Sequence, residues 1–173
     1  KEYVEILHHM LNNDLTTYEG QYYHIEEALM RPKFVAQPHP VLSVAAHGPK
    51  ALRLAATYGD AWNSYYPGKG LTPKQSSNVT RQRYEMLCEF ATEAQRDPQG
   101  IRTTFCFGFT SDGLFRSMEA FYDAIGRYYE AGIRDFSLMY AYGIDQWKEQ
   151  TITTKDLLHQ IALDAIPDLR NRI

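Results

Sequence analysis

The sequence predicts an α/β protein with a parallel sheet, and two observations support this fold class. Short apolar strand patterns alternate with amphipathic helical patterns four times over residues 41–173. The chain has no internal repeat of short period and no low-complexity tract that would indicate another architecture. Strands that alternate with helices form parallel sheets with right-handed crossovers. Because 173 residues can bury a sizeable core, we treat residues 1–173 as one domain.

Residues 1–40 precede these units and differ from them in pattern. Apolar side chains at helical spacing predict a helix over residues 1–13, and residues 16–25 predict a hairpin that turns at Glu19-Gly20. Residues 31–40 contain three prolines and predict an extended connector. Lys1 stands inside the first helical pattern with no capping residue before it, which favours a chain that is a fragment of a longer protein.

Residues 41–173 form the four strand–helix units. The predicted strands are residues 41–46, 61–66, 101–109 and 136–140. The predicted helices are residues 50–58, 73–95, the segment from Ser117 to Gly132, and the segment from Thr154 to Pro167. Their boundaries follow from local chemistry, since Thr72 and Gln75 form a capping box, Ser117 and Thr154 are N-caps, and proline ends a helix.

Composition and charge exclude several classes of function. The net charge of −3 is spread over interspersed acids and bases, so neither a nucleic-acid surface nor a polybasic membrane anchor is indicated. No apolar run approaches the ~20 residues of a membrane span. Cys88 and Cys106 are expected to be buried thiols rather than a disulfide, which fits a soluble, cytoplasmic protein. No metal-ligand constellation, nucleophile elbow or phosphate P-loop is present in the sequence.

One turn carries a candidate binding site. The strand at 41–46 turns at Gly48 into a helix, with Pro49 at the first helical position and Lys50 after it. The free N–H groups of a helix N-terminus, together with the helix dipole, favour an anion such as phosphate, and Gly48 lets it approach the backbone. A short glycine motif is weak evidence by itself, so a simple strand-to-helix turn is the alternative.

The longer context of this turn resembles the luciferase-like monooxygenase family. The resemblance rests on motifs spread along the chain, namely Tyr18-Glu19-Gly20-Gln21-Tyr22-Tyr23, Pro38-His39-Pro40, Ala46-His47-Gly48-Pro49, Tyr58-Gly59-Asp60-Ala61-Trp62-Asn63 and Ala131-Gly132-Ile133-Arg134-Asp135-Phe136. The match covers nearly the whole chain but only the C-terminal half of a family member. It therefore implies a (βα)8 TIM barrel of which this chain supplies strands five to eight, with residues 1–40 leading into the four βα units of residues 41–173.

The resemblance also implies a cofactor and a site. Family members are flavin-dependent oxidoreductases and monooxygenases that use FMN or the deazaflavin F420 on a small organic substrate, with a flavin reductase as a further partner. The cofactor phosphate lies at the loop that corresponds to Ala46, His47, Gly48, Pro49, Lys50 and Ala51. Much of the surface around the flavin ring comes from strands outside this chain, so no catalytic residue is assigned.

Barrel enzymes place their sites at the C-terminal ends of the strands. The candidate segments are Ala46 to Lys50, Asn63 to Tyr66, Phe107 to Asp112 and Tyr140 to Tyr142. Asp60 is expected to cap local backbone N–H groups, and Trp62 to lie in the core. Core packing is the first expectation for the two tyrosines of the last segment, and a substrate wall is the alternative.

Three alternatives to a barrel enzyme stay open at this stage. A flat, doubly wound sheet is possible, but helices for both faces are not obvious, which favours the half-barrel. The chain could bind flavin or phosphate without catalysis, or it could be a shortened structural protein that dimerises. Four parallel strands leave two open edges, and Leu42, Val44, Leu138 and Tyr140 are expected to face the open side. A homodimer, or a partner that supplies the N-terminal half of the barrel, would cover this side.

Overall fold

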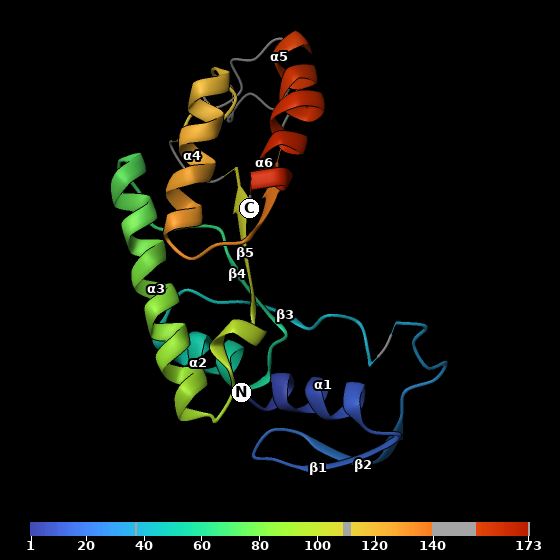
Figure 1. The fold of residues 1–173 in the computed structure, drawn as a ribbon. Coiled ribbons are helices and arrows are strands. Elements are labelled where there is room, and N and C mark those ends of the chain that lie inside the picture. The colour runs from blue at the N-terminus through green and yellow to red at the C-terminus, as the bar shows by residue number, and fades with distance from the viewer. Residues whose placement is uncertain (37, 109–111, 140–154, 173) are drawn as a thin grey trace. The chain divides into compact units, whose positions relative to one another are not determined.

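The computed structural model describes residues 1–173 except 37, 109–111, 140–154 and 173 (Figure 1). The chain divides into two compact units, which are described separately below. Unit 1 consists of Lys1–Trp62 and Met86–Arg102. Unit 2 consists of Asn63–Glu85 and Thr103–Ile173.

The main sheet has four strands in the order β3-β4-β5-β6. These strands are β3 (Ser43–Ala45), β4 (Ala61–Ser64), β5 (Arg102–Phe107) and β6 (Asp135–Leu138). Strands β5 and β6 are parallel, with Cα partners that run from Thr104 and Asp135 to Phe107 and Leu138. A helix follows each of the first three strands. Helix α2 (Pro49–Tyr58) follows β3, α3 (Pro73–Glu93) follows β4, and α4 (Met118–Glu130) follows β5. The predicted α/β class with a parallel sheet is confirmed.

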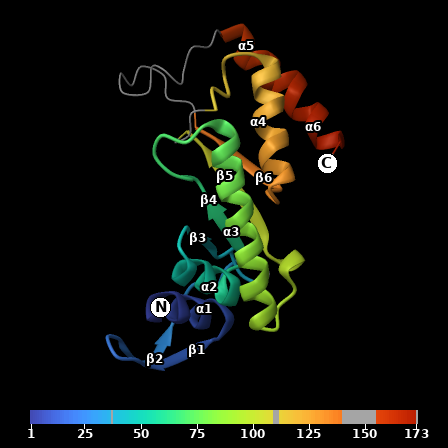
Figure 2. The same cartoon turned by 90° about the vertical axis from the view of Figure 1, so that its left-hand side faces the viewer.

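In unit 1, helix α1 (Glu2–Asn12) lies alongside an antiparallel hairpin in both views (Figure 1 and Figure 2). The hairpin consists of β1 (Leu15–Glu19) and β2 (His24–Leu29), and it turns where the sequence predicted. The carboxylate of Glu2 accepts hydrogen bonds from the backbone N–H groups of Gln21, Tyr22 and Tyr23 at 2.8–3.1 Å. These bonds hold the turn of the hairpin against α1 and lower the pKa of Glu2, with the Tyr22 N–H as the largest cause.

Asp60 and Trp62, at the start of β4, carry two of the expectations for unit 1. The carboxylate of Asp60 accepts a hydrogen bond from the Leu42 N–H at 2.7 Å, so it does cap a backbone N–H group. This N–H is not local as predicted, because Leu42 lies 18 residues away, just before β3. The side chain of Trp62 is fully buried, and its indole N–H donates to the carbonyl of Ala46 at 2.9 Å. Trp62 therefore belongs to the core and fixes the end of β3.

Unit 2 is built around the packing of α4 against β5. The hydroxyl of Ser117 accepts from the Ala120 N–H at 3.1 Å and caps α4, as predicted. The rings of Phe105 and Phe107 on β5 pack against Tyr128 on α4, with centroid distances of 4.1 Å and 5.0 Å. All three rings are essentially inaccessible to solvent, so this aromatic cluster forms the core of the unit.

The last helix differs from its prediction because Pro167 does not end it. It runs through α5 (Lys155–Gln160), a π-helical segment (Ile161–Ala165) and α6 (Ile166–Arg172). The N–H of Ile166 bonds to the carbonyl of Ile161, five residues earlier. This wider turn just before Pro167 accommodates a residue that lacks an N–H and whose ring would clash in a regular α-helix. Thr154, the predicted cap, lies outside the described residues.

The side chains on the open side of the sheet differ from those that the sequence predicted. In β3, Ser43 and Ala45 are exposed, while Leu42 and Val44 are half-buried on the opposite face. Val44 faces the end of α2, since its Cγ2 lies 3.2 Å from the position of a Cβ built on Gly59. The alternation of the pleat was predicted correctly, but the faces were assigned the wrong way round.

The same correction applies to β6 in unit 2. Leu138 contacts a cavity between β6 and the helices rather than the open side, and Ser137 is the exposed residue of the strand. Tyr140 lies outside the described residues. The exposed face of β6 is therefore more polar than predicted, which reduces the hydrophobic driving force for self-association.

Candidate functional site

The predicted anion loop joins β3 to α2 within unit 1. Ala46 is buried at 2% exposure, His47 and Ala51 are half-buried, and Gly48, Pro49 and Lys50 are exposed. Gly48 is the N-cap of α2, and its carbonyl accepts the hydrogen bond of the Leu52 N–H at 2.9 Å. The structure thus places all six predicted residues at one strand end and one helix N-terminus.

Gly48 is not required by the fold itself. Its backbone angles are φ −96° and ψ 162°, which any residue can adopt. A Cβ built on Gly48 would meet no atom of the chain within 4 Å. Because neither backbone conformation nor internal packing demands glycine here, the open space above the residue is available to a ligand that approaches the backbone closely.

The charge of this helix end also favours an anion. The first turn of α2 contains no acidic residue, and no side chain caps its N-terminus within the part of the chain that the structure describes. Its first N–H groups therefore remain available as donors, and the positive end of the helix dipole lies behind them. Lys50 adds a cationic side chain at the same helix end. Together these groups can hold a phosphate.

In unit 2, the end of β4 carries a second candidate group. The Oδ1 atom of Asn63 is buried and has no hydrogen-bond partner among the described residues. Buried polar atoms are nearly always satisfied, so this carboxamide is suited to accept from a ligand or a water molecule.

Arg83 fixes the backbone that follows β4. Its guanidinium donates to the carbonyls of Tyr66 and Pro67 at 3.0 Å and 3.3 Å. Burial lowers the pKa of Arg83, whose role here is to fix the backbone after β4.

The segment after β5 is held by a buried carboxylate. Asp112 has a side chain only 1% exposed, and it accepts from Arg127 at 2.8 Å and from the hydroxyl of Tyr128 at 3.2 Å. Burial, together with the Asp112 charge, raises the pKa of Tyr128. Asp112 therefore forms an ion pair that anchors this segment to α4. Residues 109–111 and the candidate segment Tyr140 to Tyr142 lie outside the described residues.

The sequence did not predict the role of Arg83 or the ion pair between Asp112 and Arg127. Arg83 lies 17 residues from its acceptor Tyr66, and Arg127 lies 15 residues from Asp112. A pattern of helical or strand period carries no signal for contacts of this kind. Cys88 and Cys106 form no disulfide with each other, as expected, but both are half-buried rather than buried. Among the described residues, no group of three or more histidine, cysteine or acidic side chains could hold a metal ion. No described helix is long and apolar enough to cross a membrane.

The chain belongs to the luciferase-like monooxygenase family, because the profile of that family matches residues 1–163. No curated protein sequence gives a significant match.

Solved structures show the same fold at low sequence identity. The F420-dependent tetrahydromethanopterin reductase from Methanopyrus kandleri is 15% identical, with a TM-score of 0.65, over 96% of this chain and 62% of that chain. The long-chain alkane monooxygenase LadA is 13% identical, with a TM-score of 0.63, over 99% and 55%. An F420-dependent secondary alcohol dehydrogenase is 20% identical, with a TM-score of 0.60, over 79% and 54%. The chain therefore spans little more than half the length of these enzymes.

Proposed function

We propose that this chain forms the cofactor-phosphate site of a flavin- or F420-dependent oxidoreductase or monooxygenase acting on a small organic substrate. The observation that carries the proposal is the open space at Gly48. A glycine that the fold does not need stands at an uncapped helix N-terminus beside Lys50. Membership of the luciferase-like monooxygenase family supports the same interpretation.

The residues present fit a phosphate group of FMN or F420. The N–H groups of the first turn of α2 would donate to the phosphate oxygens, Lys50 would add charge, and Gly48 would leave room for the group. The bound cofactor supplies the hydride or oxygen chemistry, and the protein supplies binding, orientation and exclusion of water. Trp62 contributes indirectly, since its hydrogen bond to Ala46 fixes the strand end that leads into the loop.

The neighbouring structures support F420 by name, while FMN rests on the family resemblance. Two of the solved structures are described as F420-dependent, and another is an alkane monooxygenase. FMN is our first choice and F420 is the alternative. Both carry the phosphate that the loop would recognise. Binding of each to the chain, measured side by side, distinguishes them.

Replacement of Gly48 by valine tests the proposal. The Cβ branch would occupy the space of the phosphate without a clash inside the protein, so FMN and inorganic phosphate should both bind at least tenfold more weakly while the melting temperature stays unchanged. Gly100→Val is the matched control, since a Cβ there also meets nothing within 4 Å. Equal affinity of wild type and Gly48→Val in calorimetry would show that the loop is only a turn.

A non-catalytic flavin- or phosphate-binding protein is the second candidate. It is supported by the coverage, since the chain aligns with only 54–62% of each of the enzyme chains that it resembles. We expect little turnover from this chain alone with reduced FMN and a long-chain aldehyde. Robust flavin-dependent turnover by a chain of verified mass would instead show that 173 residues suffice for catalysis.

The proposed enzyme also needs a partner for its sheet. Among the described residues, β3 and β6 are the outer strands, each paired on one side only. We propose a homodimer, or a complex with a polypeptide that supplies the N-terminal half of the barrel, because unpaired strand edges favour association. Light scattering at low micromolar concentration tests the homodimer. A monodisperse monomer with a sharp thermal transition would exclude it.

A further inference from the structure

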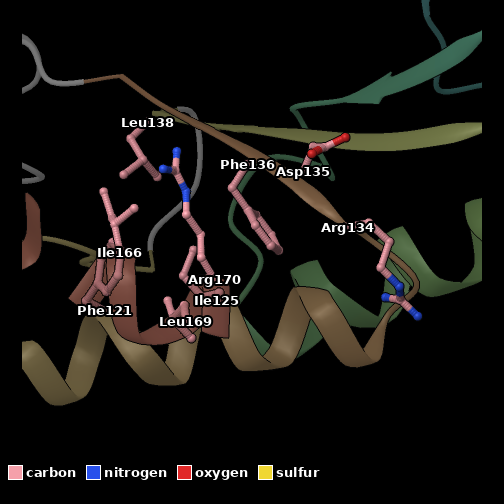
Figure 3. A pocket seen from close by; sticks show the side chains of 9 residues that line it. All are labelled: Phe121, Ile125, Arg134, Asp135, Phe136, Leu138, Ile166, Leu169 and Arg170. Carbon is pink, nitrogen blue, oxygen red and sulfur yellow. The ribbon is translucent and has the colours of Figure 1, made fainter. Parts of the chain in front are cut away.

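A cavity of about 260 Å³ lies within unit 2, on the helix side of β6. Its apolar wall is made by three elements, each of which contributes side chains of one face. These residues are Phe121 and Ile125 from α4, Phe136 and Leu138 from β6, and Ile166 and Leu169 from α6 (Figure 3). The spacings i,i+4 on α4, i,i+2 on β6 and i,i+3 on α6 explain why these pairs share a face.

The cavity is held in place by a bond between the two helices. The hydroxyl of Tyr122 on α4 donates to the carboxylate of Asp168 on α6 at 3.0 Å. The π-helical turn before α6 sets which residues of α6 face α4, because it adds one residue to the turn. The apolar wall is therefore formed where α4, β6 and α6 pack together, and it is not a groove on a single helix.

Two arginines line the cavity, and their environments differ. The guanidinium of Arg134 donates to the carbonyls of Tyr129 and Ile133 at 2.8 Å and 2.9 Å and stacks on the Tyr129 ring. Arg170 has no ion pair or hydrogen bond among the described residues. Figure 3 shows its side chain extending from α6 toward β6, while the guanidinium of Arg134 lies at the far end and points away.

One carboxylate also lines the cavity. Asp135 lies on β6, and Figure 3 shows its carboxylate directed away from Arg170. The acidic group nearest in sequence to Arg170 on the same helix is Asp168, which is bonded to Tyr122. Arg170 is thus a fixed positive charge at an apolar cavity, with its five donors available to an anion that enters.

We propose that this cavity binds a small monocarboxylic acid, with its apolar tail against Phe121, Phe136 and Leu138 and its carboxylate against Arg170. The volume is below the 300–1,000 Å³ that is usual for drug-sized ligands, so the ligand is small. A carboxylate forms charge-assisted, often bidentate hydrogen bonds with a guanidinium, which selects it over neutral molecules with the same tail. The proposal does not depend on the cofactor-phosphate site.

Octanoate is the probe, and the purified 173-residue chain is the protein. Calorimetry should show saturable binding of octanoate and at least tenfold weaker binding of octanol, which has the same tail without the charge. Arg170→Gln should lose at least tenfold in octanoate affinity, while its melting temperature stays unchanged because Arg170 makes no internal bond. Arg81→Gln, an exposed residue of α3, is the matched control and should bind like wild type.

A second variant locates the ligand independently of charge. Ile125→Phe should fill the cavity and weaken octanoate binding, with folding checked by circular dichroism. Absence of saturable octanoate binding below about 1 mM would overturn the proposal, as would equal affinity for octanoate and octanol or equal affinity of Arg170→Gln and wild type. Competition by FMN at the cavity would also contradict it, since the two sites are then not independent.

Discussion

The hydroxyl of Tyr58 donates to Oε1 of Glu5 at 2.6 Å, which joins the last residue of α2 to the first turns of α1. The hydroxyl of Tyr18 on β1 donates to the other oxygen of the same carboxylate at 2.7 Å. Glu5 is buried at 9% exposure, so one carboxylate connects three elements of unit 1. The hydrogen bond from Tyr58 is the largest cause of the lowered pKa of Glu5.

Tyr58→Phe should therefore destabilise the protein by about 1–2 kcal/mol, because it removes a donor from a buried carboxylate. The free energy of unfolding from urea titration measures this loss. Tyr22→Phe is the control, since Tyr22 is 79% exposed and its side chain makes no described hydrogen bond, and it should change stability by less than ~0.5 kcal/mol. Equal stability of the two variants would show that Glu5 is satisfied without Tyr58.

The same cluster predicts how stability depends on acid pH. The lowered pKa of Glu5 means that the folded state favours the ionised carboxylate. Its contribution is complete above the ordinary glutamate pKa of about 4.3 and is lost as pH falls through the lowered value. Urea titrations between pH 3 and pH 6 should show a steeper decline for wild type than for Glu5→Gln. Parallel curves would contradict the assignment.

At alkaline pH the dependence of stability on pH has the opposite sign. The hydrogen bond to Glu5 raises the pKa of Tyr18 to about 12, and burial raises the pKa of Tyr58 to about 12. Stability from the neutral phenols is complete below the ordinary tyrosine pKa of about 10 and is lost as pH rises toward 12. Spectroscopic titration should show Tyr18 and Tyr58 ionising later than tyrosines of ordinary pKa, in addition to Tyr128, whose pKa is also raised. In Glu5→Gln, Tyr18 should ionise earlier, and an unchanged titration would refute this coupling.

Gly132 and Gly126 form a matched pair in unit 2. Gly132 has φ +97°, and a Cβ there would lie 2.3 Å from the ring of Tyr84, whereas a Cβ on Gly126 in α4 meets nothing within 4 Å. Gly132→Ala should cost more than ~2 kcal/mol, since it combines a strained backbone with a clash. Gly126→Ala should instead stabilise by up to about 1 kcal/mol through helix propensity. Thermal and urea unfolding check both, and a neutral Gly132→Ala would contradict the described turn.

Two buried hydroxyls give a further comparison. Thr103 donates to the carbonyl of Gly132 at 2.7 Å, whereas Oγ of Ser64 is buried without a partner in the described part of the chain. Thr103→Val should cost about 1–2 kcal/mol, because it leaves that carbonyl without its donor. Ser64→Ala should be neutral or stabilising by up to about 1 kcal/mol. A clear loss of stability in Ser64→Ala would show that its hydroxyl has a partner after all.

The sequence alone determined the features that depend on local chemistry. The capping box is present, since the Thr72 N–H donates to Gln75 Oε1 at 2.9 Å and the Gln75 N–H to Thr72 Oγ1 at 3.3 Å. The Ser117 cap, the hairpin turn and Pro49 at the first position of α2 also follow from residues close in the chain. The alternation of strand and helix patterns was sufficient to predict the parallel sheet, because strands and helices have distinct periods. The family was predicted from the resemblance of its motifs.

Only the tertiary structure decided which way a strand faces and what lies beside it. Alternation in β3 does not say which of its two faces meets the helices, so Val44 was assigned to the wrong side. Pro167 indicates a helix end in isolation, but the π-helical turn before it lets the helix continue. The cavity beside Arg170 requires faces of α4, β6 and α6, which are up to about 50 residues apart in the chain, so packing and not sequence pattern creates it.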